Sequence, residues 1–123
     1  MKRILIVDDE PEMRKVIVRF LDGDGFDCVE SGSLHDAMEI VKNDQKLDAV
    51  VLDFWLKEAN ALPLLKELRA NEPGLPIVIM SGGGPKVSIE ITHLLASVVG
   101  KFRFLQKPFT RADLIEAIGI TEL

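Results

Sequence analysis

Acidic, hydroxyl and basic side chains stand at the ends of short apolar runs of this chain, where parallel strands would bring them to one edge. Asp8 and Asp9 follow the first apolar run, and Asp53 follows a second one. Ser81 comes after a third run, and Lys107 comes soon after a fourth. Carboxylates gathered at one place repel one another, so they must bind a cation or take up protons. These residue types therefore suggest a metal site with a lysine and a hydroxyl beside it.

Apolar segments alternate along the chain with segments in which apolar residues recur at the helical period. The run before Asp53 is apolar throughout and β-branched in its middle, as expected for a strand that helices cover on both faces. The predicted strands are 3–7, 27–30, 48–53, 77–80 and 102–105. The predicted helices are 11–22, about 34–41 after a cap at Ser33, about 61–72, 85–98, and 111–118 after a cap at Thr110.

Five strands alternating with five helices predict one α/β domain over residues 1–123, with a doubly wound, flavodoxin-like parallel sheet of strand order 2-1-3-4-5. In such sheets the functional crevice lies beyond the carboxyl ends of the strands, where the strand order reverses. With this order, the crevice lies between the first and third strands. Those strands end in Asp8-Asp9 and in Asp53.

Asp53 would be the reactive group of such a crevice. Mg²⁺ binds one or two carboxylates and keeps other positions for water and phosphate oxygens, which suits the three acids. Lys107 would add a positive charge, and Ser81, followed by Gly82-Gly83-Gly84, would offer a hydroxyl and open space. Acids, a metal, a lysine and a hydroxyl around one carboxylate predict phosphoryl transfer in which Asp53 is the nucleophile.

At these positions the chain resembles a response regulator receiver domain of two-component signalling, and it is similar to the chemotaxis regulator over its whole length. The resemblance rests on Asp8-Asp9 after the first strand, Asp53 after the third, Ser81 after the fourth and Lys107-Pro108-Phe109 after the fifth. It implies that Asp53 accepts a phosphoryl group from a phosphohistidine of a sensor histidine kinase or a histidine phosphotransfer protein. It implies no turnover enzyme, because such a domain catalyses only its own phosphorylation and dephosphorylation.

The resemblance also implies roles in metal binding. Asp9, Asp53 and the backbone carbonyl of Trp55 would bind Mg²⁺, and Asp8 would help through water. The family resemblance and the residue types therefore both predict Mg²⁺ as the cofactor.

The remaining residues of the resemblance would contact the phosphoryl group or respond to it. Lys107 would contact the phosphoryl group, and its peptide bond to Pro108 would be cis. Ser81 would turn toward the phosphoryl oxygens, and Phe104 would swing into the space vacated. The changed surface would then act on a downstream protein or on an effector domain fused to this one.

The loop after Asp53 departs from the family pattern. Leu56-Lys57 and Asn60-Ala61 stand where family members commonly have Met-Pro and Asp-Gly, so we expect a different loop backbone around the Trp55 carbonyl. We also predict that the Trp55 ring shields an aspartyl phosphate from water. The departure leaves a second function open, a receiver-like interaction module that no longer uses phosphorylation.

Other interpretations fit less of the pattern. The acids of Asp8-Asp9-Glu10 could stabilise only the N-terminus of the following helix, and Asp53 could be a plain helix cap. A phosphohydrolase with an aspartyl-phosphate intermediate would have a second acid two residues after Asp53, where Trp55 stands. A flavin or nucleotide carrier would need a phosphate loop after the first strand, where three acids would repel phosphate.

Composition narrows the class of partner and the compartment. With 20 acidic and 15 basic residues the net charge is −5, which argues against direct nucleic-acid binding. No apolar stretch reaches the roughly 18 residues that a membrane span needs. Cys28 is the only cysteine and cannot form an internal disulfide, so we expect a cytoplasmic protein without a membrane partner.

Overall fold

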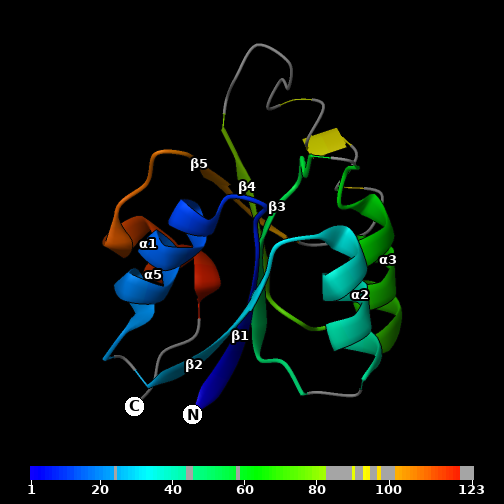
Figure 1. The fold of residues 1–123 in the computed structure, drawn as a ribbon, viewed down its shortest axis with the longest axis horizontal. Helices are drawn as coiled ribbons and strands as arrows, with labels where there is room; N and C mark the ends of the chain where they lie inside the picture. Colours follow the sequence, from blue (N-terminus) through cyan, green and yellow to red (C-terminus); the bar gives the residue numbers. More distant parts are fainter. Residues whose placement is uncertain are drawn as a thin grey trace.

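In the computed structural model the chain forms a parallel five-stranded sheet between two layers of helices (Figure 1). The structure describes residues 1–23, 25–43, 46–57, 59–82, 90, 93, 94, 97 and 102–119. The strand order is β2-β1-β3-β4-β5, which confirms the predicted order. The strands are β1 (Lys2–Val7), β2 (Phe26–Ser31), β3 (Ala49–Asp53), β4 (Ile77–Ser81) and β5 (Arg103–Gln106).

Helices cover both faces of the sheet, which explains why the central strands are apolar throughout. In Figure 1, α1 and α5 lie on one side of the sheet, and α2 and α3 lie on the other. Every residue of β3 and β4 is buried, including Asp53 and Ser81 at their carboxyl ends. The described helices are α1 (Pro11–Leu21), α2 (Leu34–Lys42), α3 (Leu62–Asn71) and α5 (Arg111–Ile118).

Alternate residues of each central strand belong to two separate cores, as the pleat of a strand requires. Val50 and Leu52 of β3 pack in the core that contains side chains of α2 and α3. Ala49 and Val51 pack in the core that contains side chains of α1 and α5. The sheet is therefore fixed from both faces, and its carboxyl edge has a defined geometry.

The ends of the helices follow local signals in the sequence. Pro11 occupies the first turn of α1, where a missing N–H costs nothing. Ser33 accepts the backbone N–H of Asp36 at 3.1 Å and so caps α2. Thr110 and Asp113 form a reciprocal capping box at the start of α5. Both predicted caps are confirmed.

The predicted helix at 85–98 falls mostly outside the described residues, so four of the five predicted helices can be compared with the structure. Within that stretch, Glu90, His93, Leu94 and Ser97 are described, and all four are helical. β5 begins at Arg103 instead of at the predicted Phe102. In the described part of the chain, no helix has the length and apolar character that crossing a membrane requires.

Candidate functional site

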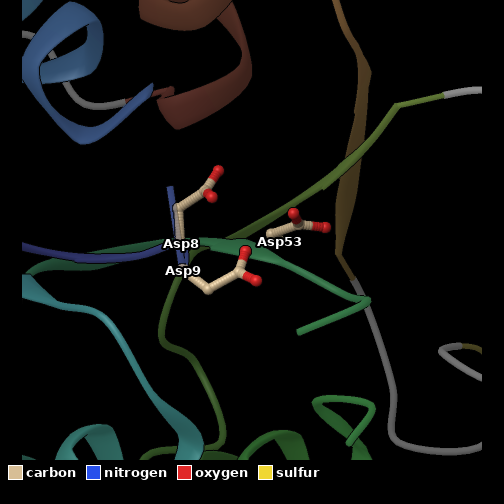
Figure 2. A group of neighbouring side chains, drawn as sticks. All are labelled: Asp8, Asp9 and Asp53. Atoms are coloured by element: carbon tan, nitrogen blue, oxygen red, sulfur yellow. The ribbon is translucent and has the colours of Figure 1, made fainter. Parts of the chain in front are cut away.

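Three carboxylates meet at the carboxyl edge of the sheet, between β1 and β3 (Figure 2). Asp8, Asp9 and Asp53 each place one oxygen atom within 4.8 Å of the others. Asp8 is fully buried, Asp53 is 8% exposed and Asp9 is half-buried. The acids therefore form the cluster that the sequence predicts at the point where the strand order reverses.

The register of the sheet explains why these acids meet. Val7 of β1 pairs with Leu52 of β3, so the next residues, Asp8 and Asp53, leave adjacent parallel strands at the same level. Asp9 follows directly, and Figure 2 shows its carboxylate near that of Asp53. The apolar strands thus set the spacing of the acids.

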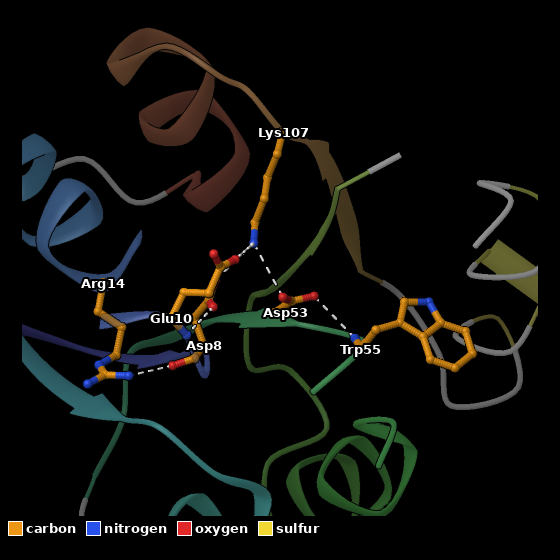
Figure 3. Close-up of polar contacts among 6 residues, drawn as sticks. All are labelled: Asp8, Glu10, Arg14, Asp53, Trp55 and Lys107. Carbon is orange, nitrogen blue, oxygen red and sulfur yellow. Dashed lines mark hydrogen bonds and ion pairs between the residues drawn. The ribbon is translucent and has the colours of Figure 1, made fainter. Parts of the chain in front are cut away.

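Lys107 lies over the acid cluster and joins two of its members (Figure 3). Its Nζ is 2.9 Å from Asp8 Oδ2 and 3.3 Å from Asp53 Oδ2, and it is 4.0 Å from Glu10 Oε1. Burial lowers the pKa of the Lys107 ammonium, but the Asp53 and Asp8 carboxylates outweigh burial, so the pKa is raised. Lys107 therefore stays protonated and supplies one fixed positive charge.

The Asp53 carboxyl group holds its proton more tightly than an ordinary aspartate. Burial is the main reason that its pKa rises from 3.8 to about 6, and the Asp8 carboxylate adds to the rise. The charge of Lys107 and the N–H of Trp55, which donates to Asp53 Oδ1 at 3.1 Å, lower the pKa and partly compensate. Asp53 is thus mostly ionised at neutral pH, as a nucleophile must be.

The loop after Asp53 is held by its own hydrogen bonds. Trp55 and Asn60 form an antiparallel bridge across it, and the N–H of Ala61 donates to the Phe54 carbonyl at 2.8 Å. Asn60 Oδ1 accepts the N–H of Leu62 at 2.9 Å, at the first turn of α3. A closed loop therefore stands where the sequence departs from the family pattern.

The indole ring of Trp55 extends away from Asp53, while its backbone N–H points toward it (Figure 3). The ring packs edge-on against Phe54, with centroids 5.3 Å apart. Its Nε1 is buried and has no hydrogen-bond partner among the described residues. In this arrangement the ring does not cover Asp53, so the predicted shielding would require it to turn.

Ser81 comes from β4, which lies beside β3, and Phe104 comes from β5, the next strand of the sheet. Ser81 is 1% exposed at the end of β4, and its carbonyl accepts the backbone N–H of Lys107 at 2.8 Å. Phe104 is half-buried in β5, and its ring lies 4.7 Å from the ring of His93, edge to face. The Lys107–Pro108 peptide bond is cis, as the resemblance implies. Ser81 thus lies at the same sheet edge as the acids, whereas Phe104 lies within β5.

Two residues near the acid cluster were not predicted from the sequence to belong to the site. Glu10 approaches Lys107, and Arg14 of α1 donates from Nη1 to the backbone carbonyl of Asp8 at 2.7 Å. The available signal was the position of Arg14 one turn before the buried Ile17, which places a cation close to the core. A bond to a backbone carbonyl leaves no further trace in the sequence.

A cavity of about 500 Å³ adjoins the cluster at Asp9. It lies between the start of α2 and the loop after β3, and residues lining it are Asp9, Ser33, Leu34, His35, Leu56 and Lys57. The acids can therefore be approached from this side.

The donor set fits a hard divalent cation. Carboxylate oxygens are the ligands that Mg²⁺ prefers, whereas zinc sites use histidine and cysteine, which this cluster lacks among the described residues. A dication would also relieve the mutual repulsion of the acids. The arrangement can thus hold Mg²⁺ next to an ionised carboxylate and a lysine.

The comparisons with known proteins agree with this geometry. The response regulator receiver domain family matches residues 4–119. A putative NtrX-like response regulator of Rickettsia bellii is 32% identical over 114 residues, which make up 91% of this chain and 23% of that protein. The transcriptional regulatory protein GlrR of Escherichia coli is 30% identical over 115 residues, or 94% of this chain and 25% of that protein. The chain thus spans about a quarter of the length of these curated relatives.

Solved structures match over nearly the whole chain. A response regulator receiver domain protein from Clostridium thermocellum has a TM-score of 0.83 and 27% identity, covering 97% of this chain and 92% of that one. The beryllofluoride-activated NtrC4 receiver domain dimer has a TM-score of 0.82 and 26% identity, covering 97% and 94%. The similarity therefore includes the strand ends that carry the acids.

Proposed function

Since the chain belongs to the response regulator receiver family, we propose that it is a phosphoacceptor switch in which Asp53 takes a phosphoryl group from a phosphohistidine, with Mg²⁺ as cofactor. One observation carries the proposal: an ionised carboxylate at the end of β3 has two further acids and a lysine around it. A helix cap or a charge cluster at a helix N-terminus would not need this convergence from three strand ends.

The transfer exchanges one bond to phosphorus for another. A carboxylate oxygen of Asp53 attacks the phosphorus atom as the bond between phosphorus and the imidazole nitrogen breaks. The electron pair of that bond returns to the imidazole of the donor. The Trp55 N–H and the Lys107 ammonium each hold one oxygen of Asp53, so the carboxylate is oriented before the donor arrives.

The negative charge of the phosphoryl group would be balanced by Mg²⁺, which the acids bind, and by the ammonium group of Lys107. Asp8, Asp9, Asp53 and the Trp55 carbonyl would hold Mg²⁺, which when bound supplies positive charge for the phosphoryl oxygens. Lys107 adds its own charge over Asp53, and its contact with Asp8 keeps it in place before transfer. Positioning and neutralisation are what such a transfer requires from a protein.

Ser81 and Phe104 would convert phosphorylation into a change of surface. Ser81 ends β4, the strand beside β3, and Phe104 lies in β5, the next strand. A phosphoryl group on Asp53 would offer oxygens for the Ser81 hydroxyl to approach. The donor would be a sensor histidine kinase or a histidine phosphotransfer protein in the cytoplasm. The output would be a downstream protein or a fused effector domain, without direct contact of this domain with nucleic acid or membrane. The domain would not act as a turnover enzyme.

A fluorescence titration tests this function, because Trp55 is the only tryptophan and is bonded to Asp53 through its backbone. Mg²⁺ is added first and a phosphoryl donor or mimic second, acetyl phosphate or beryllofluoride, with Asp53→Asn as the matched control. We expect a response to Mg²⁺ and then one to acetyl phosphate, with the second absent in Asp53→Asn. Intact mass should show one added phosphate.

The competing function is the interaction module without phosphorylation, which the unusual loop after Asp53 leaves open. It predicts no response to Mg²⁺ or to either donor, and no added mass. That result would contradict the proposed phosphoacceptor function and would leave only the assignment of the fold.

A further inference from the structure

Arg14 links the first helix to the backbone that carries two of the acids (Figure 3). Its guanidinium donates from Nη1 to the Asp8 carbonyl at 2.7 Å and from Nε to Glu30 Oε1 at 3.2 Å. The side chain is 19% exposed, so it is largely removed from water. One planar group thus joins α1, the end of β1 and the end of β2.

Asp8 is held at each of its other polar groups. Its N–H donates to the Ser31 carbonyl at 3.1 Å, and its Oδ1 accepts the N–H of Glu10 at 2.9 Å. Its Oδ2 accepts from Lys107. Arg14 supplies the contact to the remaining group, the carbonyl oxygen.

The Asp8 carbonyl matters for Asp9 because the two residues share one planar peptide group. Fixing the carbonyl fixes the plane that contains the N–H and the Cα atom of Asp9, and so the point from which the Asp9 side chain leaves the backbone. Asp9 is half-buried, and among the described residues its carboxylate forms no hydrogen bond or ion pair. The position of the Asp9 Cα atom, which the backbone sets, therefore limits how the carboxylate can reach Asp53.

Gly32 leaves the space that Arg14 occupies. A Cβ atom at this position would lie 3.0 Å from Arg14 Nη1 and 3.6 Å from its Cζ. A distance of 3.0 Å is tighter than nine in ten real Cβ contacts, so a side chain here requires the guanidinium to shift by a few tenths of an ångström. The glycine follows β2 directly and is explained by this close approach.

We infer that Arg14 is a positioning residue for metal binding: it holds the Asp8–Asp9 peptide so that both carboxylates face Asp53, and Gly32 gives it room. The inference rests on the proposed function, because it concerns the same Mg²⁺ site. It goes beyond that function by giving a role to Arg14 and Gly32, which are neither metal ligands nor phosphoryl-contacting residues in that proposal.

The charge of Arg14 and its contact with the Asp8 carbonyl have opposite expected effects on Mg²⁺ affinity when Arg14 is removed. A positive charge beside three carboxylates repels Mg²⁺, so its loss by itself would strengthen metal binding. Loss of the positioning contact would weaken binding, and residues that orient metal ligands typically contribute about 10- to 100-fold in affinity. The sign of the change therefore distinguishes the two roles.

The experiment measures Mg²⁺ affinity by calorimetric titration with MgCl₂, and stability by urea unfolding in EDTA. The variants are Arg14→Ala, Arg14→Lys and Gly32→Ala. Arg14→Lys keeps the charge but loses the planar fork. Arg19→Ala removes an exposed arginine from the same helix, and Gly74→Ala adds a methyl group where no atom lies within 4 Å.

We expect Arg14→Ala to weaken Mg²⁺ binding about 10-fold or more. Gly32→Ala should weaken it in the same direction although it changes no charge and no ligand, and both controls should bind as the wild type does. Gly32→Ala also covers the case in which Arg14→Ala fails to fold. Unchanged or tighter binding in the folded Arg14 and Gly32 variants would overturn the inference. A wild-type protein that binds no Mg²⁺ would instead overturn the proposed function, and the inference with it.

Discussion

Asp53 shows how the site trades stability for chemistry. An acceptor carboxylate must be ionised and shielded, yet burial and a neighbouring acid both make ionisation costly. Lys107 offsets only part of the free-energy cost of ionising Asp53, because the pKa of Asp53 is still raised to about 6. The folded, metal-free protein therefore holds a charge that it would be more stable without.

Replacing Asp53 with Asn should stabilise the metal-free protein by about 1 to 3 kcal/mol near neutral pH, since Asn keeps the shape and removes the charge. The pKa is raised in the fold, so the wild type is most stable relative to Asn below the ordinary value of 3.8 and loses this stability as pH rises to about 6. The advantage of Asn should thus grow across that window and stay constant above it. Urea unfolding in EDTA at several pH values measures it.

The control for this substitution is Glu116→Gln, which neutralises an exposed acid on α5. It should leave the unfolding free energy almost unchanged at every pH. Equal stability of Asp53→Asn and wild type at neutral pH would mean that the fold does not disfavour the ionised carboxylate.

Removing the charge of Lys107 should destabilise the fold, because Asp8 would remain fully buried without its cation. Breaking a buried ion pair by removing one partner typically costs about 3 to 5 kcal/mol, and we expect the lower part of that range for Lys107→Met. The double variant with Asp53→Asn should lose less than Lys107→Met alone, since one of the two acids is then neutral. Denaturant unfolding in EDTA of the wild type, the two single variants and the double variant gives a double-mutant cycle. If the changes in unfolding free energy were additive, the predicted coupling between Lys107 and Asp53 would be wrong.

At the scale of elements, the strands and the acids at their ends were the predictable part. β3 and β4 are buried on both faces, so their type could be predicted from the apolar pattern, as could the carboxyl end of β3 at Asp53. β4 runs one residue beyond its predicted end, to Ser81. Each of the five strands differs from its prediction by one residue at one end or at both, because an apolar pattern defines the middle of a strand better than its ends.

Other parts of the site could not be predicted from residue types. Arg14 and Gly32 act through a backbone carbonyl and through empty space, neither of which leaves a pattern in the sequence. The Trp55 ring packs edge-on against its neighbour Phe54, a contact that the residue types alone do not predict. Such features follow from the folded geometry and appear only once the strands are in register.

The loop after β3 is the element that should connect α3 with the metal site. Asn60→Ala removes the oxygen that accepts the Leu62 N–H, which should cost about 1 kcal/mol, as loss of a cap does. It should also weaken Mg²⁺ binding, because the same loop carries the Trp55 carbonyl. Asn71→Ala, at the exposed end of α3, is the control and should change neither. Unfolding and MgCl₂ titration separate the effects, and full Mg²⁺ affinity in Asn60→Ala would exclude a role of the loop in binding.

At the scale of the whole molecule, two apolar cores hold a sheet whose buried acids among the described residues, Asp8 and Asp53, lie at its carboxyl edge. The cores stabilise the strands, whereas the acids repel one another at the strand ends. A local event at that edge can therefore change the energy of the whole fold without changing the cores. β4 and β5 place Ser81 and Phe104 in the same sheet as Asp53.

Mg²⁺ should therefore stabilise the entire domain, because it binds the folded acids and relieves their repulsion. The unfolding free energy should rise with Mg²⁺ concentration and gain about 2.7 kcal/mol at a hundred times the dissociation constant. Asp9→Asn removes one ligand but leaves both contacts of Lys107, so it should fold and show little of this gain. NaCl at matched ionic strength controls for screening, which alone would stabilise both proteins alike. An equal gain in Asp9→Asn, or an equal gain from NaCl, would place the effect outside the acid cluster, whereas a gain confined to wild type would tie the stability of the fold to the metal site.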